Sequence, residues 1–233
     1  MKGSVTGGIT GVQVEVKHRR RALCVLSGGM DSAVAAAAVQ AQGYEIESLF
    51  IAYGQRAERM EYQAADAITS RLHGTMHTAI LPLNDLPSAL FSDELLPPLK
   101  DKSRTPDTWV PCRNLVLVSL AAAYSEALGA EIIVTGFNAE EAVYYPDNGI
   151  EFIKAMNEVL KHAVAIQSTP PRLVCPLAKY KKPDIVRLGV RLKVPFELTY
   201  SCYTGDDHHC GCCESCARRI RGFKEAGLEP VMP

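Results

Sequence analysis

The feature that most constrains the fold of this chain is a glycine-containing turn near the N-terminus. The turn follows apolar residues 22–26 and precedes alanine-rich residues 33–38. Its sequence is Ser27-Gly28-Gly29-Met30-Asp31-Ser32. An apolar segment, a glycine turn and an alanine-rich segment in this order predict a strand, a turn and a helix. Free backbone N–H groups at the start of such a helix favour an anion, so the turn is predicted to bind phosphate.

Two common phosphate-binding motifs do not match this turn. Kinase-like P-loops need G-x-x-x-x-G-K-[ST], and dinucleotide-binding folds need G-x-G-x-x-G. The turn instead resembles the SGGxDS loop of the PP-loop ATP pyrophosphatases, which cleave ATP between its α and β phosphates. The resemblance implies that Ser27, Gly28, Gly29 and Ser32 hold pyrophosphate, and that Asp31 acts near Mg²⁺ or the phosphates. The alternative is a structural turn in which Asp31 or Ser32 caps the helix.

Strand and helix signals alternate along the chain, which predicts an α/β fold with a doubly wound parallel sheet. The predicted strands are 22–27, 45–52, 77–83, 131–135 and 173–176. The predicted helices are 32–42, 57–72, 113–128, 149–165, 182–192 and 215–225. The proline-rich residues 82–111 are predicted to form a long loop with a short helix near 86–91, and loops of this length are usually functional.

The chain divides into three predicted parts. Its 233 residues are enough to bury a full core. We expect a flexible leader at 1–20, a PP-loop ATP-pyrophosphatase domain at 21–198, and a small metal-binding tail at 199–233 that packs on this domain. The basic cluster at 17–21 is interpreted as a solvated flank of the first strand.

Composition narrows the classes of partner. The formal net charge of −1 gives no global argument for nucleic-acid binding. The C-terminal quarter is locally basic, which suits either an anionic substrate or a solvated surface. No apolar run approaches the roughly 20 residues that span a bilayer, and the N-terminus lacks an apolar signal core. We therefore expect a cytoplasmic protein with no membrane contact and no direct nucleic-acid contact.

Cysteine is concentrated in the tail, where five of the eight cysteines lie between 202 and 216. Without a secretion signal, this crowding favours a metal site over disulfides. Four thiolates suit a closed tetrahedral structural zinc site. The predicted ligands are Cys202, Cys210, Cys213 and Cys216. A ligand from His208 or His209, an iron–sulfur cluster and free thiols remain alternatives; Cys212 is left outside the site.

Taken together, the motifs resemble a narrower family of PP-loop enzymes, the 7-cyano-7-deazaguanine synthases of queuosine biosynthesis. The resemblance covers nearly the whole chain after residue 20. Besides the glycine turn and the cysteine array, it is carried by Tyr53-Gly54-Gln55-Arg56, Val110-Pro111-Cys112-Arg113-Asn114, Thr135-Gly136, Tyr145-Pro146-Asp147 and Glu151-Phe152.

Two positions depart from the family pattern. Asn148-Gly149 stands where the family commonly has Cys-Arg, which removes a positive charge that would meet the substrate carboxylate. Cys112 replaces a small residue before Arg113. It is interpreted as a space-filling thiol, with a covalent thiol mechanism as the alternative.

The resemblance implies an ATP-dependent C–N ligase. Its substrates would be 7-carboxy-7-deazaguanine, ATP with Mg²⁺, and ammonia. Adenylation of the carboxylate and then of the derived amide would give 7-cyano-7-deazaguanine, AMP and pyrophosphate. The resemblance also implies a homodimer and one structural Zn²⁺ per chain, and we expect free ammonium to supply the nitrogen.

The resemblance further implies roles for individual residues, since such catalysis is mostly positioning and charge stabilisation. The predicted catalytic residues are Asp31, Ser32, Arg113 and Lys182. Predicted nucleotide-binding residues are Leu26, Ser27, Gly28, Gly29, Met30, Asp31, Ser32, Tyr53, Gln55, Arg56 and Gly136. Predicted substrate-binding residues are Arg113, Asn114, Tyr145, Asp147, Glu151, Phe152, Lys182 and Arg219. Of these, Asp147 and Glu151 are expected to bond the guanine-like face. Solvation at the surface is the alternative for Arg113, Lys182 and Arg219, and an ordinary first-turn helix charge is the alternative for Glu151.

Three other functions stay open on the sequence. A conjugating ligase would pass the adenylated deazaguanine acid to another amine, such as a protein group, and the Asn148-Gly149 change keeps this function open. A sulfur-inserting tRNA enzyme would need a catalytic cysteine pair and an RNA-binding appendage, and neither stands out. A zinc-ribbon nucleic-acid-binding protein with an inactive nucleotide site is disfavoured by the intact SGGxDS loop.

Overall fold

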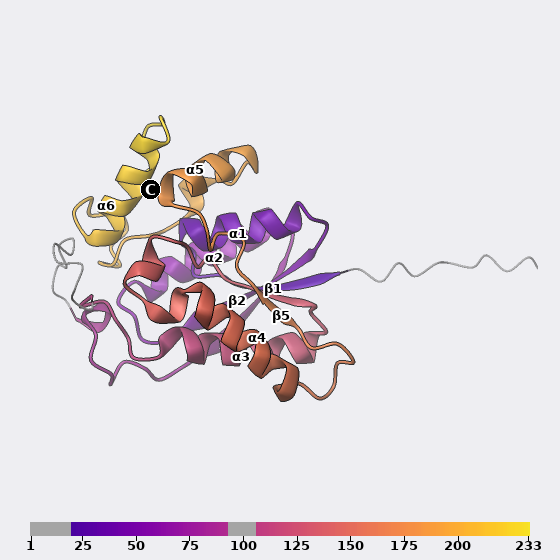
Figure 1. Ribbon diagram of the computed structural model, residues 1–233. Helices are drawn as coiled ribbons and strands as arrows, with labels where there is room; N and C mark the ends of the chain where they lie inside the picture. Colours follow the sequence, from indigo (N-terminus) through magenta and orange to yellow (C-terminus); the bar gives the residue numbers. More distant parts are fainter. Residues whose placement is uncertain (1–19, 93–105) are drawn as a thin grey trace, which may run out of the picture.

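Five parallel strands form the centre of the fold. The computed structural model describes residues 20–92 and 106–233. The strands are β1 (Arg21–Val25), β2 (Glu45–Ala52), β3 (Thr75–Ile80), β4 (Ile132–Val134) and β5 (Arg172–Val174). They lie in the order β3-β2-β1-β4-β5, and each neighbouring pair is parallel (Figure 1). The strand order reverses between β1 and β4, where open α/β sheets bind their ligands.

Helices cover both faces of the sheet (Figure 1). They are α1 (Met30–Gln40), α2 (Glu58–Arg71), α3 (Arg113–Leu128), α4 (Ile150–Ala163), α5 (Lys182–Arg191) and α6 (Glu214–Glu225). Successive side chains of β1 point to opposite faces of the sheet, and each face is covered by its own layer of helices. Ala22 and Cys24 pack toward α1, α2 and α5, while Leu23 packs toward α3 and α4. Burial of apolar side chains on both faces is what stabilises an all-parallel sheet.

The predicted doubly wound α/β fold is confirmed, and every predicted strand and long helix has a counterpart. Their ends differ by a few residues. For example, β3 ends at Ile80 and not at residue 83, because its partner β2 ends at Ala52, opposite Ile80. The predicted short helix is the single 3₁₀ turn η1 (Ala89–Phe91). Three further 3₁₀ turns were not predicted: η2 (Glu141–Val143), η3 (Pro146–Asn148) and η4 (Phe196–Leu198).

Two sequence predictions fall outside the described ranges: the leader at 1–19 and residues 93–105 of the long loop. The described end of the basic cluster contacts the end of α3 and the residue before β4. Arg20 forms an ion pair with Glu131, with 3.2 Å between Nε and Oε2. Arg21 donates a hydrogen bond to the carbonyl of Leu128 at 2.9 Å.

The C-terminal residues pack on the sheet domain in two places. Phe223 of α6 joins the core beside Phe196, with 5.1 Å between ring centroids. Four cysteines of the tail pack with Tyr200 against Ala57 and Ala64 at the start of α2. The tail therefore borders the carboxyl ends of the strands.

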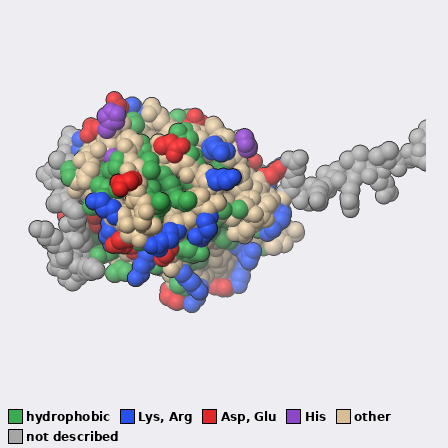
Figure 2. All heavy atoms as spheres, turned by 90° about the horizontal axis from the view of Figure 1, so that it is seen from above, with side chains coloured by type: hydrophobic (Ala, Val, Ile, Leu, Met, Phe, Trp, Pro, Cys, Tyr) green, Lys and Arg blue, Asp and Glu red, His purple; other side chains and the backbone are tan. Residues whose placement is uncertain are grey.

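The surface on the α5–α6 side carries mixed charge. Figure 2 views this side and shows lysine and arginine side chains separated by acidic and apolar ones. Such a surface does not form the continuous basic patch expected for nucleic-acid binding. Within residues 20–92 and 106–233, no helix combines the length and apolar character needed to cross a membrane.

Candidate active site

A cavity of about 250 Å³ opens at the carboxyl ends of β1, β2 and β4. Fourteen of the residues predicted for the site line it: Leu26, Ser27, Gly29, Met30, Asp31, Ser32, Tyr53, Gln55, Arg113, Asn114, Gly136, Tyr145, Lys182 and Arg219. Five predicted residues are not part of its lining: Gly28, Arg56, Asp147, Glu151 and Phe152. The cavity thus brings together residues that are up to 193 positions apart, from Leu26 to Arg219.

The glycine turn forms one wall of the cavity. Gly28 has φ +78°, and a Cβ there would lie 2.4 Å from the carbonyl oxygen of Glu61. Gly136 permits an equally close approach, since its Cβ would lie 2.7 Å from the backbone nitrogen of Ser32. No side chain among the described residues caps the start of α1. Its first N–H groups are therefore available to an anion in the cavity.

The side chains of the turn are held by short local bonds. The hydroxyls of Ser27 and Ser32 lie 3.2 Å apart, and Ser32 donates to the carbonyl of Gly29 at 3.0 Å. These bonds order the loop before any ligand binds, which lowers the entropy cost of binding.

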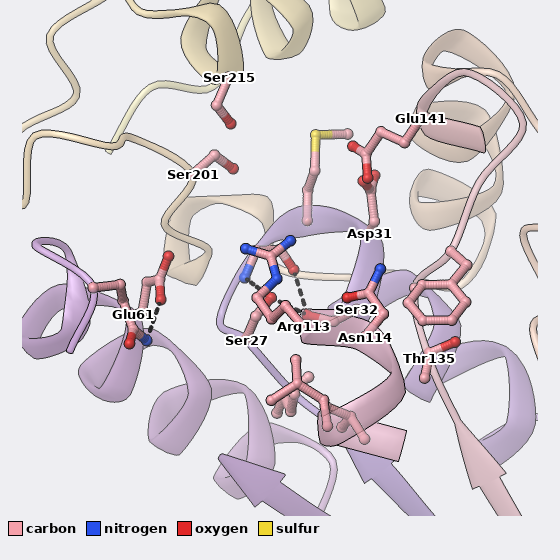
Figure 3. Close-up of a pocket in the computed structure, with 18 of the residues that line it drawn as sticks. Ser27, Asp31, Ser32, Glu61, Arg113, Asn114, Thr135, Glu141, Ser201 and Ser215 are labelled. Carbon is pink, nitrogen blue, oxygen red and sulfur yellow. Dashed lines mark hydrogen bonds between the residues drawn. The ribbon is translucent and has the colours of Figure 1, made fainter. Parts of the chain in front are cut away.

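A partly buried ion cluster lies beside the turn, and Figure 3 shows its two carboxylates, Asp31 and Glu141. Lys182, at the start of α5, donates to Asp31 and to Glu141, the latter at 2.9 Å. Asn138 donates to the same Asp31 oxygen at 3.1 Å. Asp31 Oδ1 is buried without a hydrogen-bond partner among the described residues. Asn138 and Glu141 were not predicted as site residues, because they lie between the Thr135-Gly136 and Tyr145-Pro146-Asp147 segments and belong to neither.

Burial and the neighbouring charges shift the pKa values of this cluster in opposite directions. Burial raises the pKa of Asp31 above its ordinary value, although Lys182 opposes the shift. Burial also disfavours the ionised form of Glu141, but the charges of Lys182 and Arg218 outweigh it and lower its pKa to about 2. For Lys182, burial lowers the pKa, and the two carboxylates more than reverse this. Lys182 therefore remains a cation beside the Ser27–Ser32 turn.

Arg113 enters the cavity from the first turn of α3. Its guanidinium donates to the hydroxyl of Tyr53 at 3.2 Å. Asp147 accepts bonds from both the backbone and the side-chain nitrogens of Asn114, each at 3.1 Å. Asp147 thereby caps α3 and positions Arg113, and its carboxylate is already occupied. Cys112, which precedes Arg113, is exposed and is not part of the cavity lining.

Two predicted substrate residues lie away from the cavity. Glu151 is on the exposed face of α4, where it pairs with Lys154 at 2.9 Å. Phe152 packs under the cavity wall, with its ring centroid 6.3 Å from that of Phe137. The structure therefore places Glu151 outside the cavity, away from the other residues predicted to bind substrate. The reason is its place in the first turn of α4, whose outward face is solvated.

Arg219 is almost fully buried, and its side chain forms hydrogen bonds that hold the tail in place. Its guanidinium donates to the carbonyls of Phe196 and Val231, each at 2.7 Å, and to Thr199 and Ser201. These bonds use the donors that a substrate would otherwise take.

The tail also contributes lining residues that sequence reasoning missed: Tyr200, Ser201, Tyr203, Ser215 and Arg218. Arg218 lies 3.7 Å from Glu141 and also pairs with Glu214. The basic composition of the C-terminal quarter was a signal for Arg218. It gave no reason to choose this residue over its neighbours.

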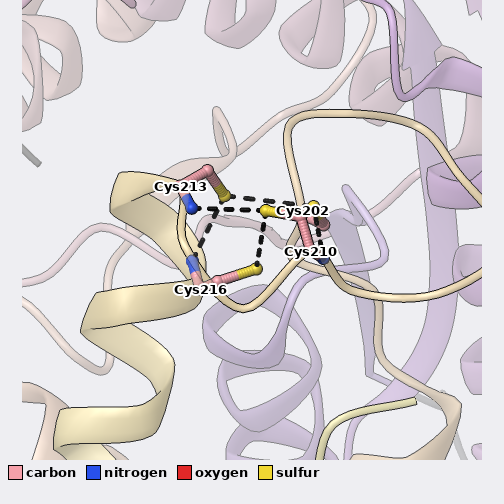
Figure 4. Close-up of side chains that lie close together, drawn as sticks. All are labelled: Cys202, Cys210, Cys213 and Cys216. Carbon is pink, nitrogen blue, oxygen red and sulfur yellow. Dashed lines mark hydrogen bonds between the residues drawn. The ribbon is translucent and has the colours of Figure 1, made fainter. Parts of the chain in front are cut away.

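The four predicted metal ligands converge into one four-cysteine group (Figure 4). The sulfurs of Cys202, Cys210, Cys213 and Cys216 all lie within 4.8 Å of one another. Two pairs, 202–213 and 210–216, are separated by 3.9 and 4.0 Å. A tetrahedral ion with Zn–S bonds of about 2.3 Å puts its sulfurs roughly 3.8 Å apart, so the group fits a metal. Backbone N–H groups donate to three of the sulfurs, and Cys212 is exposed outside the group.

The chain is similar to proteins of known name. A model of the family described as "Queuosine biosynthesis protein QueC" matches residues 21–227. A 7-cyano-7-deazaguanine synthase of Methanothrix thermoacetophila is 46% identical over 214 residues, covering 89% of this chain and 96% of that protein. One from Methanobrevibacter smithii is 41% identical over 223 residues, covering 90% and 96%.

A solved structure extends the likeness to the fold. A 4-thiouridine synthetase in complex with RNA and with bound ATP gives a TM-score of 0.51 at 19% identity. The match covers 89% of this chain and 50% of that chain. It shows that the two chains share a fold.

Proposed function

The chain belongs to the QueC family of queuosine biosynthesis proteins, and on that premise we propose that it is a 7-cyano-7-deazaguanine synthase. The observation that carries the proposal is the cavity. The Ser27–Ser32 loop and the buried Lys182 meet in it, in a chain that matches named synthases along nearly their whole length. A synthase that activates a carboxylate with ATP needs such a phosphate site beside its substrate.

The reaction uses ATP to turn a poor electrophile into a good one. The carboxylate of 7-carboxy-7-deazaguanine attacks the α-phosphorus, which forms an acyl-adenylate and releases pyrophosphate. Ammonia attacks the acyl carbon and expels AMP, which leaves the amide. The amide oxygen then attacks the α-phosphorus of a second ATP and releases a second pyrophosphate. Loss of AMP and the amide protons gives the nitrile.

This chain's residues act mainly on the phosphates. The N–H groups at the start of α1, with Ser27 and Ser32, hold the departing pyrophosphate. Lys182 and Arg113 offset the charge that develops on it. Asp31 fits a Mg²⁺ ligand because its Oδ1 is unpartnered among the described residues and carboxylate oxygen suits this ion. Bound Mg²⁺ supplies charge neutralisation on the phosphates.

Several finer points belong to the same proposal. The four-cysteine group is proposed to hold one Zn²⁺ that orders the tail, since four protein ligands leave no open position. Free ammonium is proposed as the nitrogen donor, a homodimer as the assembled state and the cytoplasm as the location, all by analogy with the family.

A conjugating ligase is the second candidate, and the cavity-lining Asn148 favours it. It stands where the family commonly places Cys-Arg, so the substrate end of the cavity differs in charge. Such a ligase would share the first adenylation and differ only in the amine that expels AMP.

The test is mass spectrometry of a reaction with 7-carboxy-7-deazaguanine, MgATP and ¹⁵N-ammonium. We expect the nitrile with one ¹⁵N and two AMP for each nitrile formed. AMP without labelled amide or nitrile would contradict ammonia as acceptor and support the conjugating ligase. Absence of AMP would overturn both candidates.

A pair of adjacent lysines provides a matched control for this assay. Lys182→Gln should lower AMP formation by about 10²-fold or more, because it removes a buried cation from the phosphate site. Lys181→Gln alters the exposed neighbour and should leave the rate within about twofold of the wild-type rate. Equal loss in both variants would contradict the role of Lys182.

A further inference from the structure

Recognition of the deazaguanine ring requires a hydrogen-bond acceptor in the cavity for the N–H donors of the ring. The ring presents two N–H donors side by side, from N1 and from the 2-amino group. Donors buried in a cavity need partners, or binding loses their hydration without compensation. A carboxylate matches this edge because its two oxygens accept two parallel bonds.

Three carboxylates line the cavity within the described residues: Asp31, Glu61 and Glu141. Asp31 and Glu141 share Lys182, and Glu141 also accepts from Asn148 at 3.3 Å. Both are therefore committed to the cation beside the phosphate loop. The carboxylates predicted from the sequence are also unsuitable, since Asp147 is bonded to Asn114 and Glu151 lies outside the cavity.

Glu61 differs from the other two carboxylates. It lies in the first turn of α2, half-buried and facing the cavity, with no lysine or arginine bonded to it among the described residues. Gln55 donates to its Oε2 at 2.9 Å, and the backbone N–H of Tyr53 in turn donates to Gln55 at 2.8 Å. The Gln55 amide thus fixes one side of the carboxylate and leaves acceptor capacity directed at the cavity.

The position of Glu61 suits the shape of the substrate. Figure 3 shows Glu61 on one side of Ser27 and Ser32, with Asp31 and Glu141 on the other. In the substrate, the C7 carboxylate lies at the opposite end of the fused rings from the N1 and 2-amino edge. A ring anchored at Glu61 therefore extends its carboxylate toward the phosphate loop, where the α-phosphorus is attacked.

We propose that Glu61 is the specificity residue that bonds the N1–H and 2-amino groups of the 7-deazaguanine substrate. This inference rests on the proposed function. It assigns a substrate contact to α2, a helix from which the sequence analysis drew no site residue.

The test compares two variants of α2 on two bases. Glu61→Gln keeps the acceptor for Gln55 and removes the second charge-assisted bond. Glu58→Gln changes a carboxylate in the same helical turn that is not part of the cavity lining. The bases are 7-carboxy-7-deazaguanine and 7-carboxy-7-deazahypoxanthine, which lacks the 2-amino group. Thermal melting of each variant establishes that it is folded.

We expect the wild-type enzyme to prefer the 2-amino base by about 10- to 100-fold in kcat/KM, because one charge-assisted bond is lost with the analogue. Glu61→Gln should raise KM for the 2-amino base by a similar factor, leave KM for ATP within about twofold, and lose most of the preference between bases. Glu58→Gln should behave like the wild type.

Three results would overturn the inference. Glu61→Gln could keep the wild-type KM and preference, which would leave the function standing without this contact. It could raise KM for ATP instead, which would assign Glu61 to the nucleotide. Wild-type protein that neither binds the base in calorimetry nor forms AMP from it would remove the proposed function and this inference together.

Discussion

At the scale of single residues, burial decides what each charged group does. Lys182 and Arg219 are both buried cations near the cavity, yet they differ in partners. Lys182 faces two carboxylates beside the Ser27–Ser32 turn, whereas Arg219 faces carbonyl and hydroxyl oxygens of η4 and the tail. A buried cation surrounded by neutral acceptors is a structural anchor, and a cation aimed into a cavity is available to a ligand.

Arg219 provides a stability test of that distinction. Arg219→Lys should lower the free energy of unfolding by about 2–4 kcal/mol, because lysine cannot reproduce the planar set of bonds to Phe196, Val231 and Thr199. Urea denaturation measures the change. Arg221→Lys, at an exposed position on the same helix, should change it by less than about 0.5 kcal/mol. Equal effects would contradict the anchor role.

Glu61 predicts a dependence of stability on pH. Burial raises its pKa to about 7 from an ordinary 4.5; Gln55 and Arg113 oppose the shift and Glu58 adds to it. The folded protein therefore binds this proton more tightly than the unfolded chain does. The stabilisation is full below pH 4.5 and is lost as the pH rises through about 7.

The measurement is urea denaturation of wild type and Glu61→Gln at about pH 5 and pH 8. Glutamine does not titrate, so only the wild type loses stability as the pH rises. The unfolding free energy of the variant relative to the wild type should therefore increase by about 1–3 kcal/mol from pH 5 to pH 8. A constant difference in unfolding free energy would show that Glu61 titrates normally.

At the scale of elements, the site depends on where strands end and helices begin. β1 and β4 end on either side of the reversal in strand order, and α1, α3 and α5 begin beside these ends. Parallel strands place all their carboxyl ends at one edge, so loops far apart in the chain meet there. The three helix starts bring Ser32, Arg113 and Lys182 into one cavity.

The close approach of the glycine turn to α2 gives a test at this scale. Gly28→Ala combines a positive φ with a Cβ that would lie 2.4 Å from the Glu61 carbonyl oxygen. We expect it to cost about 2–5 kcal/mol of stability and to abolish AMP formation. Gly43→Ala has φ +88° but no atom within 4 Å of its Cβ, so it should cost only about 1 kcal/mol. Similar losses in denaturation curves would mean that φ alone matters.

At the scale of the whole molecule, the cysteine tail and the sheet domain build one site. The four-cysteine group packs on the start of α2, and Tyr200, Ser201 and Arg218 reach from the tail into the cavity. A metal in the four-cysteine group would therefore order these tail residues of the cavity from outside the cavity.

Metal removal tests this coupling. Elemental analysis should find one zinc per chain, and Cys216→Ser should lose it together with the larger part of the activity. Cys212→Ser, outside the group, should keep both. A strong chelator should lower the melting temperature of the wild type and expose residues 199–233 to protease. Iron with a visible absorption band would contradict zinc, and full activity without metal would contradict the coupling.

Much of this protein was readable from local sequence. Strand and helix alternation gave the α/β class, because apolar pattern and glycine stops are local properties. The SGGMDS turn predicts a phosphate site and lines the cavity, and the x2 spacings of the tail predict the four-cysteine group that the structure shows, since neighbouring residues alone create both local geometries. Lys182 was also chosen from the sequence, by family resemblance.

Tertiary structure alone decided which polar groups face the cavity. Glu61, Glu141 and Arg218 line it, although none of them belongs to a segment that was predicted to form the site. Asp147 and Glu151 were expected at the substrate, but one caps α3 and the other points to solvent. The physical reason is that a side chain's partners depend on the packing of distant elements. Burial, and with it charge and pKa, is therefore set by the fold.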